Sequence, residues 1–475
     1  MKSPDALLGA WEETLARKSH AAAILATNGN ILRTFDDIER RARDFAHQID
    51  TFRPGDVLAV QIGNHEDWPS ILIAGLRKQV VVLPLERSIS DQQRDVALEM
   101  CGATAVAFAL PGGNAPEIFR LRSPKDRAQS ADATGKWDER HPALLKLTSG
   151  TTATPRAIRF RSEQLLADCT QICDTMGITN ADLNFGVIPI SHSYGFSNLL
   201  TPLLVRGVPM ALSRDRTPRA VLVDLARTGA TVFPGMPLFY QAFCEMETVP
   251  DLAKLRLCIS AGAPLSHAIA EKFRDKFGLS IHSFYGASEC GGICYDHDGK
   301  SGAEGFVGQP MKGVSLEILD PRAASSQIRV RSAAVADGYF PGSDETKLGH
   351  GVFIPDDLVA RNGTGFLIVG RVSDVINVAG KKVNPVEVEA HLLQFTGVRQ
   401  AVVFGRPAAA GALRNEEVAA CVVVDGSVRE NDLLEFCRSG LSGWQVPKRI
   451  FIVDSLPVNE RGKISRRELA LLFFP

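Results

Sequence analysis

The sequence lacks the features that would indicate a membrane or a nucleic-acid setting. Its longest apolar stretches, such as residues 80–85, are far shorter than a membrane-spanning helix. Residues 1–20 alternate charged with apolar side chains and have no continuous apolar run of a signal peptide. No charge predominates, because 53 Lys and Arg balance 54 Asp and Glu. We therefore expect a cytoplasmic protein with no membrane span and no nucleic-acid partner.

The nine cysteines include no Cys-x-x-Cys pair, and their number is odd. Both facts favour a reducing compartment over a disulfide framework. Cys169 with Cys173, and Cys290 with Cys294, have helical i,i+4 spacing but no neighbouring histidine ligands. We expect these thiols to be buried small side chains, and we predict no metal–thiolate site.

The 475 residues, 45% of them hydrophobic, are enough for roughly two to four packing units. Residues 56–62 have the pattern of a strand, 68–76 that of a helix and 80–85 that of a buried strand. Such alternation predicts layered α/β structure. Thr34 and Ser90 stand where helix caps are expected.

The stretch 147–158 has the character of a phosphate-holding loop. Apolar residues lead into the small or hydroxylated residues 148–154, whose backbone N–H groups and hydroxyls can face phosphate oxygens. The loop is not that of the common NTPases, because it has one glycine and no Lys-Ser/Thr pair. Residues expected to hold nucleotide phosphates are Thr148, Ser149, Gly150, Thr151, Thr152 and the basic Arg156.

This loop resembles the phosphate loop of the AMP-forming adenylating enzymes, which include acyl- and aryl-CoA ligases, peptide-synthetase adenylation domains and luciferases. Their usual form is Thr-Ser-Gly-Thr-Thr-Gly-x-Pro-Lys-Gly, from which this chain departs at Ala153, Arg156 and Ala157. The resemblance implies a large α/β N-terminal domain (1–371) of layered subdomains with a small β region. It also implies a small mobile α+β C-terminal domain (372–475), with ATP, Mg²⁺ and CoA as ligands.

The segment 191–196 follows a predicted strand, the usual place for ligands in α/β proteins. His192 and Tyr194 match the family position where a histidine and an aromatic residue border the carboxylate and acyl pocket. The aspartate that grips an α-amino group in amino-acid-activating members has no counterpart there, so amino acids are disfavoured. An apolar pocket suited to an aromatic or fatty acid is expected from Tyr194, Phe196, Phe233, Met236 and Gly291.

The segment Tyr285-Gly286-Ala287-Ser288-Glu289 resembles the family's Tyr-Gly-x-Thr-Glu. The resemblance implies that Tyr285 faces adenine, Gly286 allows close backbone approach and Ser288 meets the α-phosphate. Glu289 would hold Mg²⁺ between the phosphates, with Thr151 as the second metal residue. The family's adenine-flanking stretch corresponds to Gly262, Ala263 and Pro264.

Six further residues take their roles from the resemblance. Asp357, with Arg371 as its partner, would bind the ribose hydroxyls. Ser373 and Asp374 occupy the hinge, and Gly380 would border the channel for the incoming thiol. Lys463, in the terminal loop, matches the catalytic lysine that lies between the acid and the α-phosphate.

The implied reaction activates a carboxylic acid as an acyl-adenylate, releases pyrophosphate and then passes the acyl group to CoA. Two alternatives remain open. The acceptor could instead be a phosphopantetheine on an acyl carrier protein, or the chain could be a nucleotide-binding paralogue without turnover.

Overall fold

The computed structural model describes residues 5–109, 115–121, 137, 140–148, 156–299, 303–342, 344–378, 381–407, 416–457 and 466–473. The chain divides into two compact units, a larger one (Met1–Glu317 and Arg329–Ile354) and a smaller one (Ile318–Ile328 and Pro355–Pro475). Within the described ranges, none of the helices is both long and apolar enough to cross a membrane.

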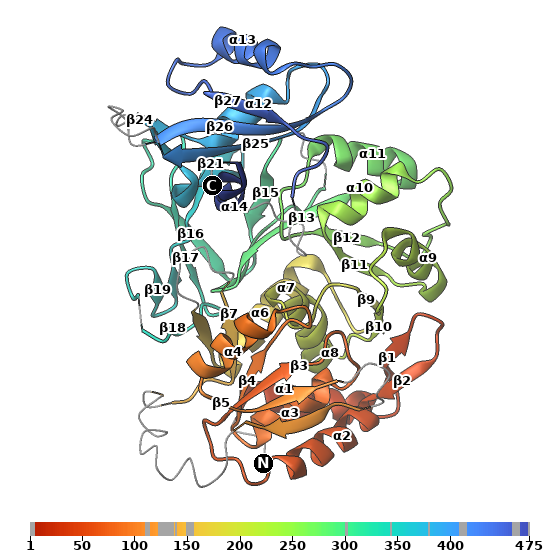
Figure 1. Cartoon of the computed structure of the whole chain (residues 1–475). Coiled ribbons are helices and arrows are strands. Elements are labelled where there is room, and N and C mark those ends of the chain that lie inside the picture. Colours follow the sequence, from red (N-terminus) through yellow and green to blue (C-terminus); the bar gives the residue numbers. More distant parts are fainter. Residues whose placement is uncertain are drawn as a thin grey trace. The chain divides into compact units, whose positions relative to one another are not determined.

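The larger unit contains two mixed sheets (Figure 1). The first has the order β2 (Ile31–Thr34), β1 (Ala22–Ala26), β10 (Met210–Leu212), β9 (Asn184–Gly186), β11 (Val232–Gly235), β12 (Leu257–Ser260), β13 (Ile281–Ala287), β14 (Gly291–Tyr295) and β15 (Phe306–Pro310). The second has the order β18 (Gly338–Phe340), β8 (Ala157–Phe160), β7 (Leu144–Leu147), β4 (Val81–Pro84), β3 (Val57–Gln61), β5 (Ala103–Phe108) and β6 (Glu117–Arg120). Short strands β17 (Ile328–Ser332), β20 (Val352–Phe353) and β19 (Leu348–Gly349) form a small β region of their own.

Local sequence explains where these elements begin and end. Every residue of β3 and β4 is buried, as expected for parallel strands in the middle of a sheet. Thr34 caps α2 with a reciprocal Asp37 bond, and Ser90 accepts from the N–H of Gln93 at the start of α4, so both predicted caps are confirmed. Helix α6 ends at Gly177, whose φ of 63° is left-handed.

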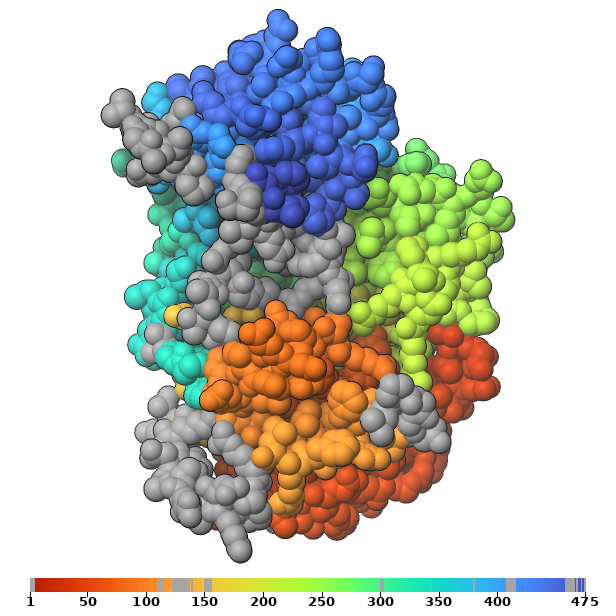
Figure 2. Space-filling view, viewed as in Figure 1, coloured from red at the N-terminus to blue at the C-terminus, as the bar shows by residue number. Residues whose placement is uncertain are grey.

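Helices pack around both sheets. Helices α9, α10 and α11, green in Figure 1, lie alongside β11 to β13, and their residues form one continuous yellow-green surface in Figure 2. The α-helices that the structure describes in this unit are α1 (Ala6–Lys18), α2 (Phe35–Gln48), α3 (Trp68–Arg77), α4 (Asp91–Met100), α6 (Ser162–Met176), α7 (Ser193–Gly195), α8 (Thr201–Arg206), α9 (Pro218–Thr228), α10 (Pro237–Glu245) and α11 (His267–Phe277).

The smaller unit is an α+β layer built on β25 (Val398–Pro407), β26 (Glu416–Val424) and β27 (Arg449–Ile452). Alternate residues of β26 enter two separate cores. Val418, Ala420 and Val422 pack with α12 (Pro385–Leu392) and α13 (Glu430–Gly440), whereas Ala419, Cys421 and Val423 pack with Leu469 of α14 (Arg466–Phe473). Helices therefore cover both faces of this sheet. Strands β23 (Ile376–Val378) and β24 (Lys381–Val383) form a further hairpin.

The smaller unit begins before the expected domain boundary at residue 371. Strands β21 (Asp357–Asn362) and β22 (Gly365–Arg371) form a hairpin, and the amide of Asn384 donates to the Val369 carbonyl at 2.7 Å. This bond ties the hairpin to the start of α12 within the smaller unit. A rotation point after residue 371 stays a prediction.

Candidate active site

Several predicted site segments of the larger unit follow the carboxyl ends of strands in the first sheet. Strands β9, β11, β12 and β13 pair in parallel, so their carboxyl ends point the same way. These ends lead to His192, Met236, the segment 262–264 and the segment 285–289. Four stretches that are far apart in the sequence are therefore brought to one edge.

His192 caps the short helix α7, and its Nδ1 accepts the backbone N–H of Tyr194 at 3.3 Å. An accepting ring nitrogen carries no proton, so this bond assigns the proton of the neutral ring to Nε2. The Ser193 hydroxyl donates to the Ser288 hydroxyl at 3.0 Å. The histidine segment is thus bonded directly to the segment that carries the predicted α-phosphate contact.

Asn64 holds the irregular chain that leads to His192. Its amide nitrogen donates to the Ile188 carbonyl at 3.0 Å, with longer contacts to the carbonyls of Gly186 and Val187. Its amide oxygen accepts the N–H of Ile190 at 3.0 Å. Where the backbone hydrogen bonds of β9 end, the side chain of Asn64 therefore takes over and bonds to the following segment.

The predicted phosphate loop is the connection between antiparallel strands β7 and β8. Thr148 donates to the Arg156 carbonyl with its backbone N–H at 2.9 Å and with its hydroxyl at 3.2 Å. These bonds close the base of the loop. Ala157, where the family usually has glycine, pairs with Leu147 and Phe340 and is fully buried, so a small side chain is needed there.

Tyr339 connects this loop to the carboxylate predicted to hold a metal. Its hydroxyl donates to Glu289 Oε1 at 3.2 Å, and the Arg156 guanidinium lies 5.6 Å from its ring centroid. The backbone N–H of Ala336 also donates to the Glu289 carbonyl at 2.9 Å. The second sheet thereby contributes directly to the site at the edge of the first.

A buried lysine lies one residue before the end of β7. Lys146 is 5% exposed, and its Nζ lies 4.5 Å from the Phe160 ring centroid and 5.4 Å from that of Phe196. Burial lowers the pKa of Lys146, while the nearby negative charge of Asp168 opposes that shift. The Lys146 ammonium is therefore partly desolvated and lies near two aromatic rings.

Asp168, on α6, joins two predicted site segments. Its carboxylate accepts the Ser197 hydroxyl at 2.6 Å and the Gly292 N–H at 3.0 Å. Gly291 has a φ of 68°, and a Cβ there would lie 2.0 Å from Asp168 Oδ1. The closeness of Asp168 therefore explains why residue 291 is a glycine. Its place in the acyl pocket stays a prediction.

The aromatic residues predicted for the acyl pocket lie mainly in the core. Phe196 and Phe233 are each 1% exposed, and the Phe233 ring packs against Phe243 at a centroid distance of 5.8 Å. The Tyr194 hydroxyl donates to the Ile259 carbonyl at 3.4 Å, and burial raises the pKa of this phenol, which keeps it neutral. Met236 is half-buried at the start of α10. That these residues contact an acyl group stays a prediction.

The predicted adenine residues differ in accessibility. Gly262 and Pro264 are exposed and Ala263 is half-buried after β12, whereas Tyr285 is 8% exposed. A Cβ on Gly286 would lie 2.7 Å from the Gly291 carbonyl, so strand packing alone requires glycine there. Contacts of these residues with adenine stay predictions.

In the smaller unit, Asp357 and Arg371 stand opposite each other on β21 and β22. Arg371 Nε donates to Asp357 Oδ1 at 2.8 Å. The partnership expected from the sequence is thus present. Binding of a ribose by this pair stays a prediction.

The hinge residues Ser373 and Asp374 lie in a short helical turn, Val372–Asp374, of the smaller unit. Arg466, the first residue of α14, contacts Asp374 Oδ2 at 2.6 Å and both carboxylate oxygens of Glu389 at 2.8 and 3.0 Å. Its Nε donates to the Val403 carbonyl at 2.9 Å. One guanidinium therefore joins the hinge, α12, β25 and α14.

Several predicted site residues fall outside the described ranges. They are Ser149, Gly150, Thr151, Thr152, Gly380 and Lys463. Their roles stay predictions.

The donor set fits a magnesium ion shared with nucleotide phosphates. No group of three or more His, Cys, Asp or Glu side chains that could hold a metal occurs in the described part of the chain. Mg²⁺ in nucleotide enzymes typically takes one or two carboxylates, and phosphates and water complete its shell. Glu289, with Oε1 oriented by the Tyr339 hydroxyl, meets that requirement.

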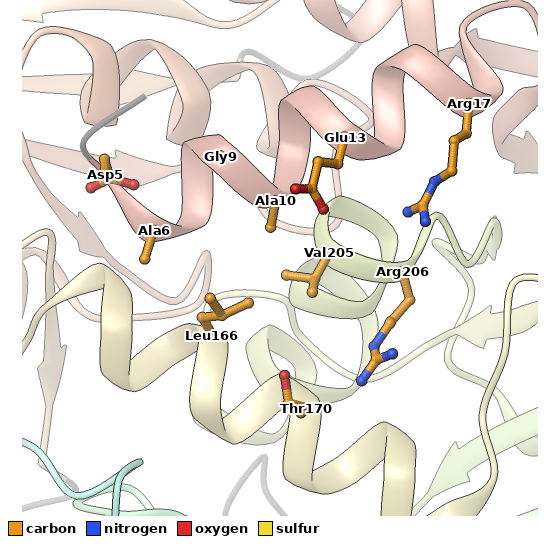
Figure 3. Close-up of a pocket in the computed structure, with 10 residues that line it drawn as sticks. All are labelled: Asp5, Ala6, Gly9, Ala10, Glu13, Arg17, Leu166, Thr170, Val205 and Arg206. Carbon is orange, nitrogen blue, oxygen red and sulfur yellow. The ribbon is translucent and has the colours of Figure 1, made fainter. Parts of the chain in front are cut away.

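A separate hollow lies among α1, α6 and α8 (Figure 3). Helix α1 contributes Ala6, Gly9, Ala10, Glu13 and Arg17, and the facing helices contribute Leu166, Thr170, Val205 and Arg206. None of the predicted site residues that the structure describes lines it. We assign it no role in the reaction.

Comparison with known proteins decides the family. The family described as "AMP-binding enzyme" matches residues 11–340, and "AMP-binding enzyme C-terminal domain" matches residues 387–463. The chain belongs to the AMP-binding enzyme family. This membership confirms the superfamily, the fold class and the enzyme class expected from the sequence, an AMP-forming acid–thiol ligase.

Three relatives illustrate the range of the family. Feruloyl-CoA synthase of Amycolatopsis sp is 28% identical over 98% of this chain and 99% of its own length. A 3,4-dihydroxybenzoate–[aryl-carrier protein] ligase of Bacillus anthracis is 27% identical over 70% of this chain and 74% of its own. The crystal structure of ATP-bound MatB from Rhodopseudomonas palustris shares the fold, with a TM-score of 0.84 at 24% identity over 98% of both chains.

The sequence did not assign roles to four residues that the structure places beside the predicted ones. They are Asn64, Lys146, Tyr339 and Arg466. Lys146 and Tyr339 each stood in a stretch with a strand pattern. Only tertiary contacts distinguish them from ordinary strand residues.

Proposed function

We propose that this enzyme is an acyl- or aryl-CoA ligase that activates a carboxylic acid with ATP and transfers the acyl group to CoA. The observation that carries the proposal is the chain of contacts from Arg156 through Tyr339 to Glu289, at the edge where β9, β12 and β13 also end. One tyrosine thus contacts both the cation proposed to bind phosphate and the carboxylate proposed to bind the metal, and this supports the proposal.

In the first half-reaction, the acid oxygen attacks the α-phosphorus of ATP and pyrophosphate leaves. Bound Mg²⁺ would supply charge neutralisation at the phosphates. Arg156 and the loop before it would hold the departing pyrophosphate, Ser288 would donate its hydroxyl to the α-phosphate, and Lys463 would lie between the acid and the α-phosphate.

His192, which follows β9, would orient the acyl carbonyl of the bound acid. Because its Nδ1 accepts the Tyr194 N–H, the neutral ring presents Nε2–H as a donor. In the second half-reaction, a thiol attacks the mixed anhydride and AMP leaves. The small domain would turn about Ser373 and Asp374, which withdraws Lys463 and brings Gly380 beside the thiol.

The substrate we infer is an aromatic or fatty acid, because the residues proposed for the pocket are apolar and the segment 191–196 contains no aspartate. The 28% identity to a feruloyl-CoA synthase supports an aryl acid. The similarity to a carrier-protein ligase supports the second candidate, transfer to a phosphopantetheine on an acyl or aryl carrier protein.

The decisive experiment measures pyrophosphate release from ATP and Mg²⁺ with a panel of aryl, short-chain, medium-chain and long-chain acids. Each acid is tested alone, with CoA and with a phosphopantetheinylated carrier protein, and a reaction without acid serves as control. CoA-stimulated release with one class of acid is expected. Stimulation by the carrier protein alone would support the second candidate, and no release with any acid would support a non-catalytic paralogue.

Lys463→Ala tests the order of the two steps. Adenylate formation is expected to fall by at least about a hundredfold, the usual loss when a group that stabilises developing charge is removed. Thioester formation from supplied acyl-AMP should persist, because Lys463 would have left the site by then. Equal loss in both half-reactions would contradict this role.

A further inference from the structure

Tyr339 contacts two groups to which the proposed function gives different tasks. Its hydroxyl donates to Glu289 Oε1 at 3.2 Å, and its ring faces the Arg156 guanidinium at 5.6 Å. We propose that Tyr339 is a positioning residue, which fixes the separation between the metal-holding carboxylate and the phosphate-holding cation. This inference rests on the proposed function.

The backbone of Tyr339 is well placed for such a role. Strand β18 pairs with β8 so that Tyr339 stands opposite Ile158, two residues after Arg156. Asp337, two residues before Tyr339, accepts hydrogen bonds from the Arg161 guanidinium at 2.6 Å and from the Gln164 amide at 2.8 Å. The ring therefore projects from a strand that is bonded to the end of the phosphate loop itself.

The two contacts act on the nucleotide by different means. The hydroxyl bond sets the direction in which the Glu289 carboxylate presents its oxygens, and outer bonds of this kind tune metal affinity. The ring restricts the Arg156 guanidinium through a cation–π contact. Loss of the hydroxyl should therefore weaken metal-dependent binding of ATP, whereas loss of the ring should also weaken binding that needs no metal.

Titration calorimetry of ATP, without acid or CoA, separates these effects. It is performed with Mg²⁺ and again with a chelator on the wild type, Tyr339→Phe and Tyr339→Leu. For Tyr339→Phe we expect Kd to rise about tenfold with Mg²⁺, the effect of one hydrogen bond to a charged group, and less than about twofold without it. For Tyr339→Leu we expect a further rise, of about threefold, under both conditions.

Tyr295→Phe is the matched control. Tyr295 is a buried tyrosine of β14 whose ring stacks on His282, outside the groups proposed to bind nucleotide. It should leave both Kd values unchanged. Tyr339→Phe in a Glu289→Gln background tests the route of the effect, because the hydroxyl should have no further influence once the carboxylate is neutral.

The outcomes distinguish this inference from the proposed function. A wild type that binds no ATP under either condition would overturn both. A wild type that binds Mg²⁺ and ATP normally, with Tyr339→Phe unchanged or weakened equally with and without Mg²⁺, would overturn the positioning role alone. The positioning role would also be overturned if the Tyr339→Phe effect persisted in full in the Glu289→Gln background.

Discussion

The proposed nucleotide-binding edge of the larger unit, called here the nucleotide edge, and the proposed hinge region of the smaller unit hold their residues by different means. At the nucleotide edge, segments start from strands β8, β11, β12, β13 and β18, whose backbone ladders fix them. At the hinge, Asp374, Glu389 and the Val403 carbonyl converge on the single guanidinium of Arg466. A hinge has to change its dihedral angles, so bonds from one side chain suit it better than a continuous ladder.

The largest effect is expected from Arg466→Ala. This change leaves two carboxylates without the guanidinium and removes the donor to Val403. We expect a loss of about 2–3 kcal/mol in the stability of the smaller unit, somewhat below the cost of breaking a fully buried pair. Hydrogen exchange of α12, α14 and β25 measures it.

Arg399→Ala in the same unit is the control. Arg399 pairs with Asp425 at 2.9 Å, but the two side chains are 57% and 66% exposed. Its removal should change stability by less than about 1 kcal/mol. If both variants lost the same stability, Arg466 would be an ordinary surface ion pair and the comparison of the two regions would fail.

Asn64→Ala tests a place where a side chain, and not a backbone ladder, holds the nucleotide edge. Two good hydrogen bonds to the segment 188–190 are lost, so unfolding in urea should show a decrease of about 1–2 kcal/mol. The KM for the acid should rise more than the KM for ATP, because this segment leads to His192. Asn28→Ala, in an exposed turn, should change neither.

Arg156→Lys tests how much the guanidinium at the end of the phosphate loop contributes to ATP affinity. Lysine keeps the charge but not the planar guanidinium that faces Tyr339, so ATP affinity is expected to fall by less than about tenfold, or about 1.4 kcal/mol. Calorimetry with Mg²⁺ and ATP measures the change. A much larger loss would mean that Arg156 binds phosphate through a two-pronged contact that lysine cannot make.

The smallest expected effect concerns Lys146, which should make the free energy of unfolding depend on pH. Burial lowers its pKa below the ordinary value of 10.5, so the unfolded chain binds this proton more tightly than the folded one. The contribution is unfavourable at neutral pH and disappears as the pH rises through 10.5. The stability of the wild type relative to Lys146→Met should therefore rise between about pH 7 and about pH 10. Urea unfolding of both proteins at both pH values tests this, and a difference that does not change with pH would contradict it.

The sequence predicted those features that depend on local patterns. Strand–helix alternation predicted the α/β layers, Thr34 predicted a cap, and the thiols of Cys169, Cys173, Cys290 and Cys294 were predicted to be buried. The motif order predicted the family, and the expected partnership of Asp357 with Arg371 is present.

Long-range side-chain bonds could not be predicted in the same way. Tyr339 is 50 residues from the carboxylate it contacts, and Arg466 is 92 residues from Asp374. No periodic pattern or fixed spacing in the sequence indicates either bond. The bond from the Asn384 amide to the Val369 carbonyl, which joins segments on either side of residue 371, is of the same kind.

All nine cysteines are free and buried, which has a practical consequence for observing the proposed domain rotation. Burial raises the pKa of Cys258, Cys290 and Cys294, so their thiols should react slowly with maleimide dyes. New cysteines at exposed positions, such as Glu271 in one unit and Ser439 in the other, could then be labelled selectively. Energy transfer between two such dyes could follow the rotation in single molecules without first removing the native thiols.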